Sequence, residues 1–257
     1  MTLTAMLITG CHHKPTMREM GIVLDTLITT SQAPLFDSLP SSPQCEVSIQ
    51  LITLANDDLS SINDSLLRSG ILSPEYLSLT TIHLTPKTAI DSFIKRYVDD
   101  YRSFYSGIYT DESDREALTM SYALATHIEE GRDSVLNYLG TITQRQGAVT
   151  TSYTVCRNID VPSQRLLSLD DIFVHGHEKA LGEAILNQLM KQSGNKTLDQ
   201  LHEAGFFVNV EPYPTSNFIL GDKTITFVYV TGEIASREKG EIQVELRYSD
   251  LKNIMRR

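Results

Sequence analysis

One long amphipathic helix, set among segments with strand periodicity, constrains the fold of this chain more than any other feature. Thr85 has a side chain that can cap a helix, and Pro86 is favoured at the first helical position. Apolar residues with helical spacing then continue for about 20 residues. They are Ile90, Phe93, Ile94, Tyr97, Val98, Tyr101, Phe104 and Tyr105. The pattern predicts a helix with one wet face and one face buried against a sheet.

Period-two alternation of apolar and polar residues predicts the strands. Short turns separate three successive alternating segments, so we expect an antiparallel meander covered by the long helix. A helix over residues 176–192 and a shorter one ending before Gly205 precede two closing strands. The alternating segments are 47–51, 118–128, 135–143, 148–159, 225–229 and 242–248. Helices and strands lack a βαβ rhythm, which predicts an α+β fold with a larger sheet-and-helix half and a smaller half of helices and strands.

Composition excludes several classes of protein. The 257 residues hold 22 basic and 32 acidic side chains, a net charge of −10 that argues against nucleic-acid binding. No apolar run reaches the roughly 20 residues of a membrane-spanning helix. The sequence lacks a nucleophile elbow, a phosphate-binding loop and a dinucleotide glycine pattern. We therefore expect no cofactor and no enzymatic activity.

The first eleven residues have the order of a lipoprotein signal. An apolar stretch ends in Ile8-Thr9-Gly10-Cys11, which resembles a bacterial lipobox, and polar residues follow directly. We predict a signal segment over 1–11, a lipid on Cys11 and a location in the cell envelope, in contact with the membrane only through that lipid. The segment lacks a preceding basic residue, which leaves open a start upstream of Met1, and the alternative is a buried first strand.

Residues 12–44 are predicted to be a tether between this anchor and the folded part, because the segment is rich in proline and polar residues. The paired His12 and His13 lack a third metal ligand there. We place the N-terminal α+β half at 45–145 and the C-terminal half at 146–257.

The C-terminal half resembles domain of unknown function family 3298. The resemblance is carried by residues 167–173 (LSLDDIF), 217–220 (NFIL), 224–229 (TITFVY), 232–235 (GEIA), 240–244 (GEIQV) and 248–251 (YSDL). Residues 45–145 are similar in layout to domain of unknown function 4163. The likeness is strong over 160–251 and covers about 80% of the chain in outline.

The resemblance implies an envelope protein without a known activity. Related domains form the extracellular part of lysozyme-binding anti-sigma factors or precede the catalytic domain of peptidoglycan deacetylases. Two positions depart from the family pattern. Val149 stands where relatives commonly have a histidine, and Thr231-Gly232 with the loop 236–239 replace a Pro-Tyr pair and an aromatic loop.

A few residues are candidates for chemistry. His175 and His177 have a spacing that can bring two imidazoles to one metal, with Asp170 and Asp171 nearby. We expect these residues to be ordinary loop residues, and the adjacent acids 99–100 and 129–130 to be solvated.

Two further groups of residues have open roles. Cys45 and Cys156 lie in predicted strands, where they are either two buried thiols or a disulfide. The aromatic rings of the long helix, with Tyr109, are expected in the core, the alternative being the wall of a binding groove.

Together these patterns predict a non-catalytic, lipid-anchored envelope protein. We expect it to bind a peptidoglycan fragment or a protein ligand such as a basic muramidase, which the acidic net charge would attract. The alternative is a hydrolase of cell-wall polymers that uses His175 and His177. The ligand, the periplasmic or surface face of the membrane and the oligomeric state stay open.

Overall fold

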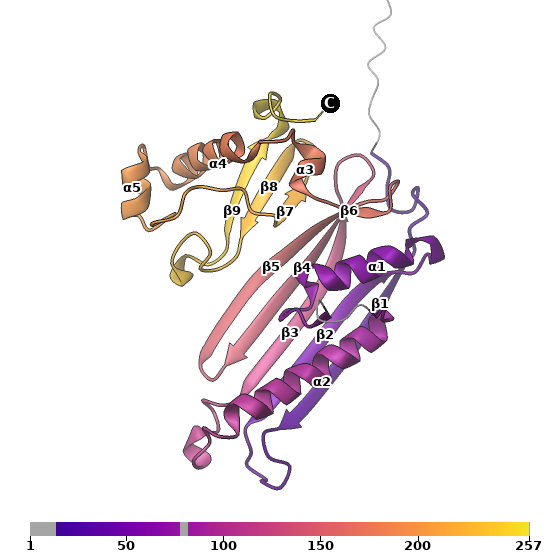
Figure 1. The fold of residues 1–257 in the computed structure, drawn as a ribbon, viewed down its shortest axis with the longest axis vertical. Helices are drawn as coiled ribbons and strands as arrows, with labels where there is room; N and C mark the ends of the chain where they lie inside the picture. Colours follow the sequence, from indigo (N-terminus) through magenta and orange to yellow (C-terminus); the bar gives the residue numbers. More distant parts are fainter. Residues whose placement is uncertain (1–13, 78–81, 257) are drawn as a thin grey trace, which may run out of the picture.

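The protein is described by a computed structural model over residues 14–77 and 82–256, in which two sheets and their helices form an α+β fold (Figure 1). The larger sheet has six strands in sequence order, β1 to β6. Only the pair β2–β3 is parallel. The strands are β1 Leu24–Pro34, β2 Gln44–Leu54, β3 Met120–Glu130, β4 Val135–Gln146, β5 Val149–Asp160 and β6 Arg165–Leu167. The predicted α+β class and the antiparallel meander β3–β4–β5 are confirmed.

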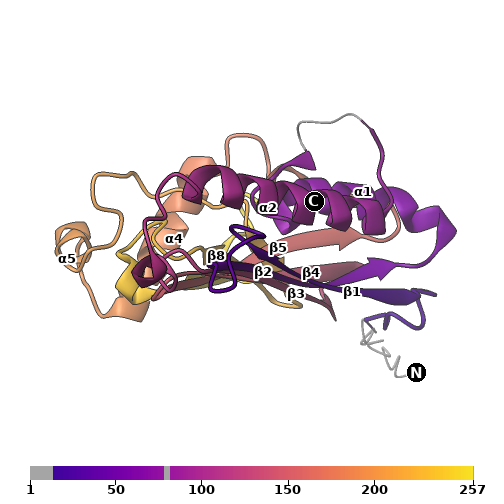
Figure 2. The same ribbon diagram turned by 90° about the horizontal axis from the view of Figure 1, so that it is seen from below.

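The parallel pair requires a long crossover, and the helices of the first unit lie in it. The crossover holds α1 Ser60–Leu66 and α2 Pro86–Tyr105, with short turns of helix η1 Asp57–Leu59, η2 Leu67–Ile71 and η4 Glu112–Asp114. Figure 2 shows α1 and α2 on one face of the sheet. The predicted helix start is confirmed, because Thr85 Oγ1 accepts a hydrogen bond from Thr88 N at 3.3 Å.

The buried face of α2 covers mainly β1 and β2, and its aromatic rings reach β3. Phe93 and Tyr97 lie 5.0 and 5.3 Å, ring centre to ring centre, from Tyr122. Tyr101 is also buried, whereas Phe104 is 70% exposed. The aromatic residues of this helix are thus mostly core, and they stabilise the first unit by burying apolar area.

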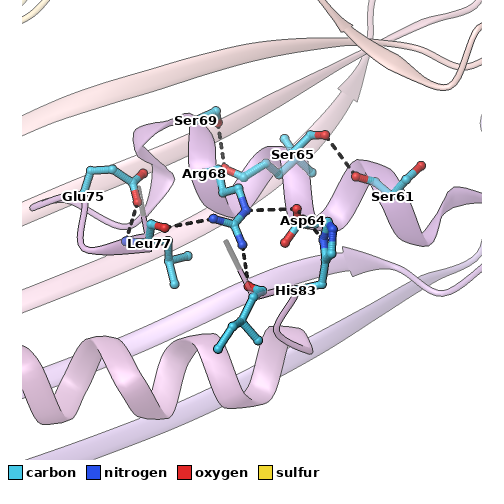
Figure 3. A network of polar contacts seen from close by, with 10 residues as sticks. Ser61, Asp64, Ser65, Arg68, Ser69, Glu75, Leu77 and His83 are labelled. Atoms are coloured by element: carbon cyan, nitrogen blue, oxygen red, sulfur yellow. Dashed lines mark hydrogen bonds and ion pairs between the residues drawn. The ribbon is translucent and has the colours of Figure 1, made fainter. Parts of the chain in front are cut away.

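A polar network holds the residues that precede α2 against α1 and η2 (Figure 3). Arg68 donates to Asp64 Oδ2 at 3.0 Å and to the carbonyl oxygens of Leu77 and Ile82 at 2.8 and 2.7 Å. His83 Nδ1 lies 3.2 Å from the same carboxylate oxygen of Asp64. One guanidinium therefore holds three points of the chain, which only the tertiary structure brings together.

The predicted tether over residues 12–44 is wrong for the described residues. Residues 24–34 form β1, which pairs along its whole length with β2. Met17, Met20 and Ile22 pack against the first core, and the backbone N of Met17 donates to Glu130 Oε1 at 2.7 Å. The segment has the composition of a linker because β1 is an edge strand whose outward side chains, apart from Ile28, are mostly polar. Residues 1–13, with the predicted signal segment, Cys11, His12 and His13, lie outside the described residues.

The second unit packs helices on a three-stranded antiparallel sheet. Its elements are α3 Leu169–Ile172, α4 Glu178–Ser193, α5 Leu198–Glu203, β7 Phe218–Leu220, β8 Thr224–Tyr229 and β9 Ile242–Arg247, with short turns of helix η5 Arg237–Lys239 and η6 Tyr248–Asp250. α4 contacts β9 and buries Leu181, Ile185 and Leu189. Gly205 follows α5 with φ +83°, as expected for a glycine that ends a helix.

The predicted division at residues 145 and 146 is also wrong. That position lies in the hairpin between β4 and β5, which pair from Val135↔Asp160 to Gln146↔Val149. Strands β5 and β6 complete the first sheet, so the units change after Leu167. The division cuts the meander that the alternation itself predicts, because no local signal in the sequence shows that the larger sheet ends at the three-residue strand β6.

Three buried asparagines join the two units. Asn137 and Asn158 stand opposite each other on β4 and β5, and both are at most 3% exposed. Asn158 receives a hydrogen bond from Leu220 N at 3.1 Å and donates to Phe218 O at 2.9 Å. Asn137 donates to Leu220 O at 3.3 Å. These side chains fix β7 against the outer face of the larger sheet.

Asn217 completes the junction from the other side. Its side chain accepts from Cys156 N at 2.6 Å and donates to Thr154 O and Val228 O, both at 2.8 Å. Buried backbone groups that would otherwise be unpaired are thus satisfied across the interface.

We predict that Asn158→Leu lowers the free energy of unfolding by about 3 kcal/mol, because Leu220 N and Phe218 O stay buried and lose this partner. Urea denaturation measures the change. The control Asn253→Leu replaces an exposed asparagine and is expected to change stability by less than about 0.5 kcal/mol. Equal losses in the two variants would show that the junction does not depend on this amide.

Candidate functional site

A groove of about 740 Å³ lies in the second unit, between α4, the start of α5 and residues 211–214. We call it the α4 groove. Leu186, Leu198, Pro212, Tyr213 and Pro214 supply its apolar surface.

Gly182 and the two prolines build one wall of the groove. A Cβ atom at Gly182 would stand 2.6 Å from Pro212 O, so only glycine lets residues 211–214 lie this close to α4. The prolines favour an extended path for this segment. A mid-helix glycine costs about 1 kcal/mol relative to alanine, which indicates that close packing is the reason for it here.

Tyr213 is fixed by its neighbours. Its hydroxyl donates to Glu233 Oε1 at 2.8 Å, and its backbone oxygen accepts from the Tyr229 hydroxyl at 2.5 Å. The rings of Phe207 and Tyr229 meet it edge to face at 6.2 and 5.9 Å. Burial, and then the bond to Glu233, raises the pKa of Tyr213, so its hydroxyl stays protonated. The groove therefore has a preformed aromatic wall.

The rim of the groove is acidic. Glu178, Glu183 and Glu211 are exposed around it, and Lys179 is the basic residue among the lining side chains. None of the three glutamates takes part in an ion pair within residues 14–77 and 82–256. An apolar floor with free carboxylates at its edge suits a ligand that presents an apolar side chain beside basic groups.

A second cleft, of about 350 Å³, lies between the β4–β5 hairpin and the loop after β8. It brings together the two places where the sequence departs from the family pattern, because Val149 and Thr231 both line it. Arg145 and Arg237 are exposed at its sides, and Gly232 has φ +86° in the adjoining turn. The sequence could not show that the two departures are neighbours.

The structure separates His175 from His177. His177 is 3% exposed, its Nδ1 lies 3.0 Å from Val174 O, and its ring centre is 5.4 Å from that of Phe173. His175 is exposed. One imidazole is thus packed at the start of α4 while the other faces solvent. Within the described residues, no three His, Cys, Asp or Glu side chains are grouped to hold a metal ion.

The acids near these histidines have structural contacts. Asp171 Oδ2 accepts from Ser168 N and Oγ, both at 2.8 Å, and Oδ1 pairs with Arg165 at 2.8 Å. Arg165 in particular lowers the pKa of Asp171 to about 2. Asp170 Oδ1 lies 3.8 Å from His177 Nδ1. These contacts cap α3 and stabilise the start of the second unit.

The adjacent acids have similar roles. Asp99 and Asp100 pair with Lys95 and Arg96 on the wet face of α2. Glu129 is exposed, and Glu130 holds the backbone of Met17.

The two cysteines of the fold are free thiols on opposite faces of the larger sheet. Cys45 belongs to the core under the helices, and Cys156 packs with Leu139 and Val228 toward the second unit. Burial raises the pKa of each thiol to about 12. They are therefore inert core residues and not a disulfide.

A His–Asp pair that the sequence did not indicate occurs in the crossover of Figure 3. His83 and Asp64 are far apart in the chain but in contact. His83 is 86% exposed, and Asp64 is held by Arg68. The pair fastens the crossover and does not lie in either cleft.

The fold and the groove define a two-unit α+β protein whose second unit forms its own cleft. Residues 170–249, which include the whole α4 groove, match the family described as Protein of unknown function (DUF3298). This match confirms the resemblance inferred from the sequence motifs. Residues before 170 lie outside the match, so the likeness of the first half to family 4163 and the likeness to anti-sigma factors stay predictions.

Two crystal structures of DUF3298 family members share the fold. A protein from Bacteroides fragilis is 22% identical with a TM-score of 0.77, over 92% of this chain and 94% of its own. A protein from Pseudomonas aeruginosa is 15% identical with a TM-score of 0.60, over 91% of this chain and 94% of its own. Comparison with curated proteins gives no match. Within the described residues, no helix is both long enough and apolar enough to cross a bilayer.

We predict that Gly182→Ala destabilises the protein by about 1–3 kcal/mol although alanine is the better helix former, because the new methyl group meets backbone at Pro212. Thermal unfolding measures the change. In the control Gly107→Ala, a Cβ has no atom within 4 Å, so stability is expected to stay the same or rise slightly. An unchanged melting temperature for Gly182→Ala would contradict this account of the groove.

Proposed function

We propose that this protein is a non-catalytic, lipid-anchored protein of the bacterial cell envelope, and that its α4 groove binds a basic protein ligand such as a muramidase. One observation carries the proposal: the α4 groove combines an apolar floor and an ordered aromatic wall with three exposed glutamates. The net charge of −10 supports it, since a basic partner would be attracted over a long range.

The groove favours a protein over a sugar polymer as ligand. Free carboxylates at a rim contribute most when the partner brings lysine or arginine side chains to them. A glycan chain without basic groups gains no such attraction. The cell-wall fragment thus becomes the second outcome of the binding test.

The hydrolase alternative requires His175 and His177 to act together. The exposed His175 and the buried His177 do not support a shared site. Neither histidine is among the lining residues of the α4 groove. Non-catalytic binding therefore agrees better with the geometry.

The lipid anchor rests on Cys11 and the apolar segment before it. We predict that cells expressing the protein incorporate labelled palmitate into it and that Cys11→Ser removes the label. Cys45→Ser serves as the control, because that thiol is buried in the first core. Failure of the parent protein to take up label would overturn the lipid-anchor part of the proposal.

Binding is tested by calorimetric titration with a purified basic muramidase. We predict that Glu178→Gln, Glu183→Gln and Glu211→Gln together weaken binding about tenfold at low salt, or about 1.4 kcal/mol, and make it less dependent on salt. A matched variant with Asp91→Asn, Glu112→Gln and Glu116→Gln has the same net charge, alters exposed residues of the first unit and is expected to bind like the parent protein.

Two results would contradict the proposed ligand. Equal weakening by both triple variants would assign the effect to net charge alone. Binding of soluble peptidoglycan fragments in the absence of muramidase binding would replace the basic protein with a wall ligand.

A further inference from the structure

The first described residue, Lys14, is held by contacts with both units. Lys14 Nζ donates to Glu130 O at 2.7 Å and lies 3.1 Å from Asp222 Oδ1. Met17 N adds a bond of 2.7 Å to Glu130 Oε1. Lys14 therefore ties together the turn after β3 and the turn between β7 and β8, one from each unit.

This contact limits where a lipid on Cys11 can be. Lys14 follows Cys11 by three positions in the chain, and three fully extended residue steps span only about 11 Å. A tether of some thirty residues would let the body turn freely above a membrane. Instead, a lipid on Cys11 holds the Lys14 end within about one nanometre of the bilayer surface.

We call the end of the molecule around Lys14 the Lys14 end. The part of it beside Asp222 is basic, unlike the chain as a whole, because a hollow there is lined by Lys223, Arg247 and Lys252 and by one acid, Asp222. Toward β6 the charges are mixed, since Arg132 and Arg256 stand among Asp133, Asp160 and Asp171. The basic excess thus belongs to the hollow.

Contacts hold these residues together. Arg132 lies over the Tyr248 ring at 4.5 Å, and the Tyr248 hydroxyl donates to Gly221 O at 3.0 Å. A shallow hollow of about 470 Å³ is lined by Asp222, Lys223, Tyr248 and Lys252 among others. Lys223 and Lys252 are exposed, and neither takes part in an ion pair within the described part of the chain.

We propose that the Lys14 end is a membrane-docking surface that binds the phosphate groups of anionic phospholipids. The proposal rests on the proposed lipid anchor, which brings this end to the bilayer. Lys223 and Lys252 supply free ammonium groups, and each basic residue near an anionic surface favours binding about fivefold. Attraction fades within about 10 Å, so residues elsewhere contribute little. The acidic remainder of the protein is repelled, and the molecule takes one orientation.

This orientation determines how far the other parts of the molecule lie from the bilayer. β4 has 12 residues and spans about 40 Å, so the β4–β5 hairpin stands far from the bilayer. Figure 1 shows the hairpin at the opposite end of the long strands from the C-terminus.

The test uses the full chain coupled through Cys11 to a maleimide-bearing lipid, so it does not depend on lipidation in cells. Cys45 and Cys156 are buried thiols with a pKa of about 12, which directs the reagent to Cys11, and mass spectrometry checks this. Hydrogen exchange is compared on vesicles of phosphatidylcholine alone and of phosphatidylcholine with phosphatidylglycerol.

We expect exchange over residues 221–224 and 248–256 to slow severalfold on the anionic vesicles, with residues 146–149 unchanged. Lys223→Glu with Lys252→Glu should abolish the slowing. The matched control, Lys87→Glu with Lys95→Glu, changes net charge equally on the wet face of α2 and should keep it.

The outcomes separate this proposal from the one on which it rests. Equal exchange on both kinds of vesicle, or loss of the slowing in both double variants, would overturn the docking surface. Hydrogen exchange that slows only when Lys223 and Lys252 are present, together with no palmitate label in cells, would support the docking surface and would contradict the proposed lipid anchor.

Discussion

The asparagine junction between the sheets is the contact on which the rest of the molecule depends. Residues 135–140 of β4 and 155–159 of β5 are largely buried, by the first core on one side and by the second unit on the other. A purely apolar second face would leave Phe218 O and Leu220 N of the short strand β7 without their partner Asn158. The side-chain amides of Asn137 and Asn158 form hydrogen bonds with β7 in the place where a neighbouring strand would use its backbone amides. Because amide hydrogen bonds are directional, they also set the position of the second unit.

The cleft at the β4–β5 hairpin and the Lys14 end follow from that position. The cleft at the β4–β5 hairpin exists only where the two units meet. At the other end of the strands, Lys14 bonds to one unit and pairs with the other. The α4 groove is different, since it is built within the second unit by the contact of Gly182 with Pro212. The proposed ligand site and the proposed membrane-docking surface thus lie on separate parts of the fold.

The early strand β1 changes how an anchored protein of this kind would be held. The composition of residues 12–44 predicts a linker. An edge strand exposes many of its residues to water and can therefore have the same composition. Because this segment is folded from Lys14 onward, only two residues lie between Cys11 and the folded part. A lipid there becomes an orienting device as well as an anchor, and the charge of the nearest surface gains a physical role.

The sequence by itself determined the local elements. It gave the capped start of α2 at Thr85, the three-stranded meander, the glycine end of α5 and the motifs that match DUF3298, because spacing and capping are properties of neighbouring residues. Tertiary structure alone decided that β1 joins the sheet, that the units change after β6 and that His175 and His177 point to different surroundings. In the sequence, Asn137 and Asn158 are only two residues of a type that is uncommon in strands. Their meaning depends on pairing and burial between residues far apart in the chain, and no local pattern records those contacts.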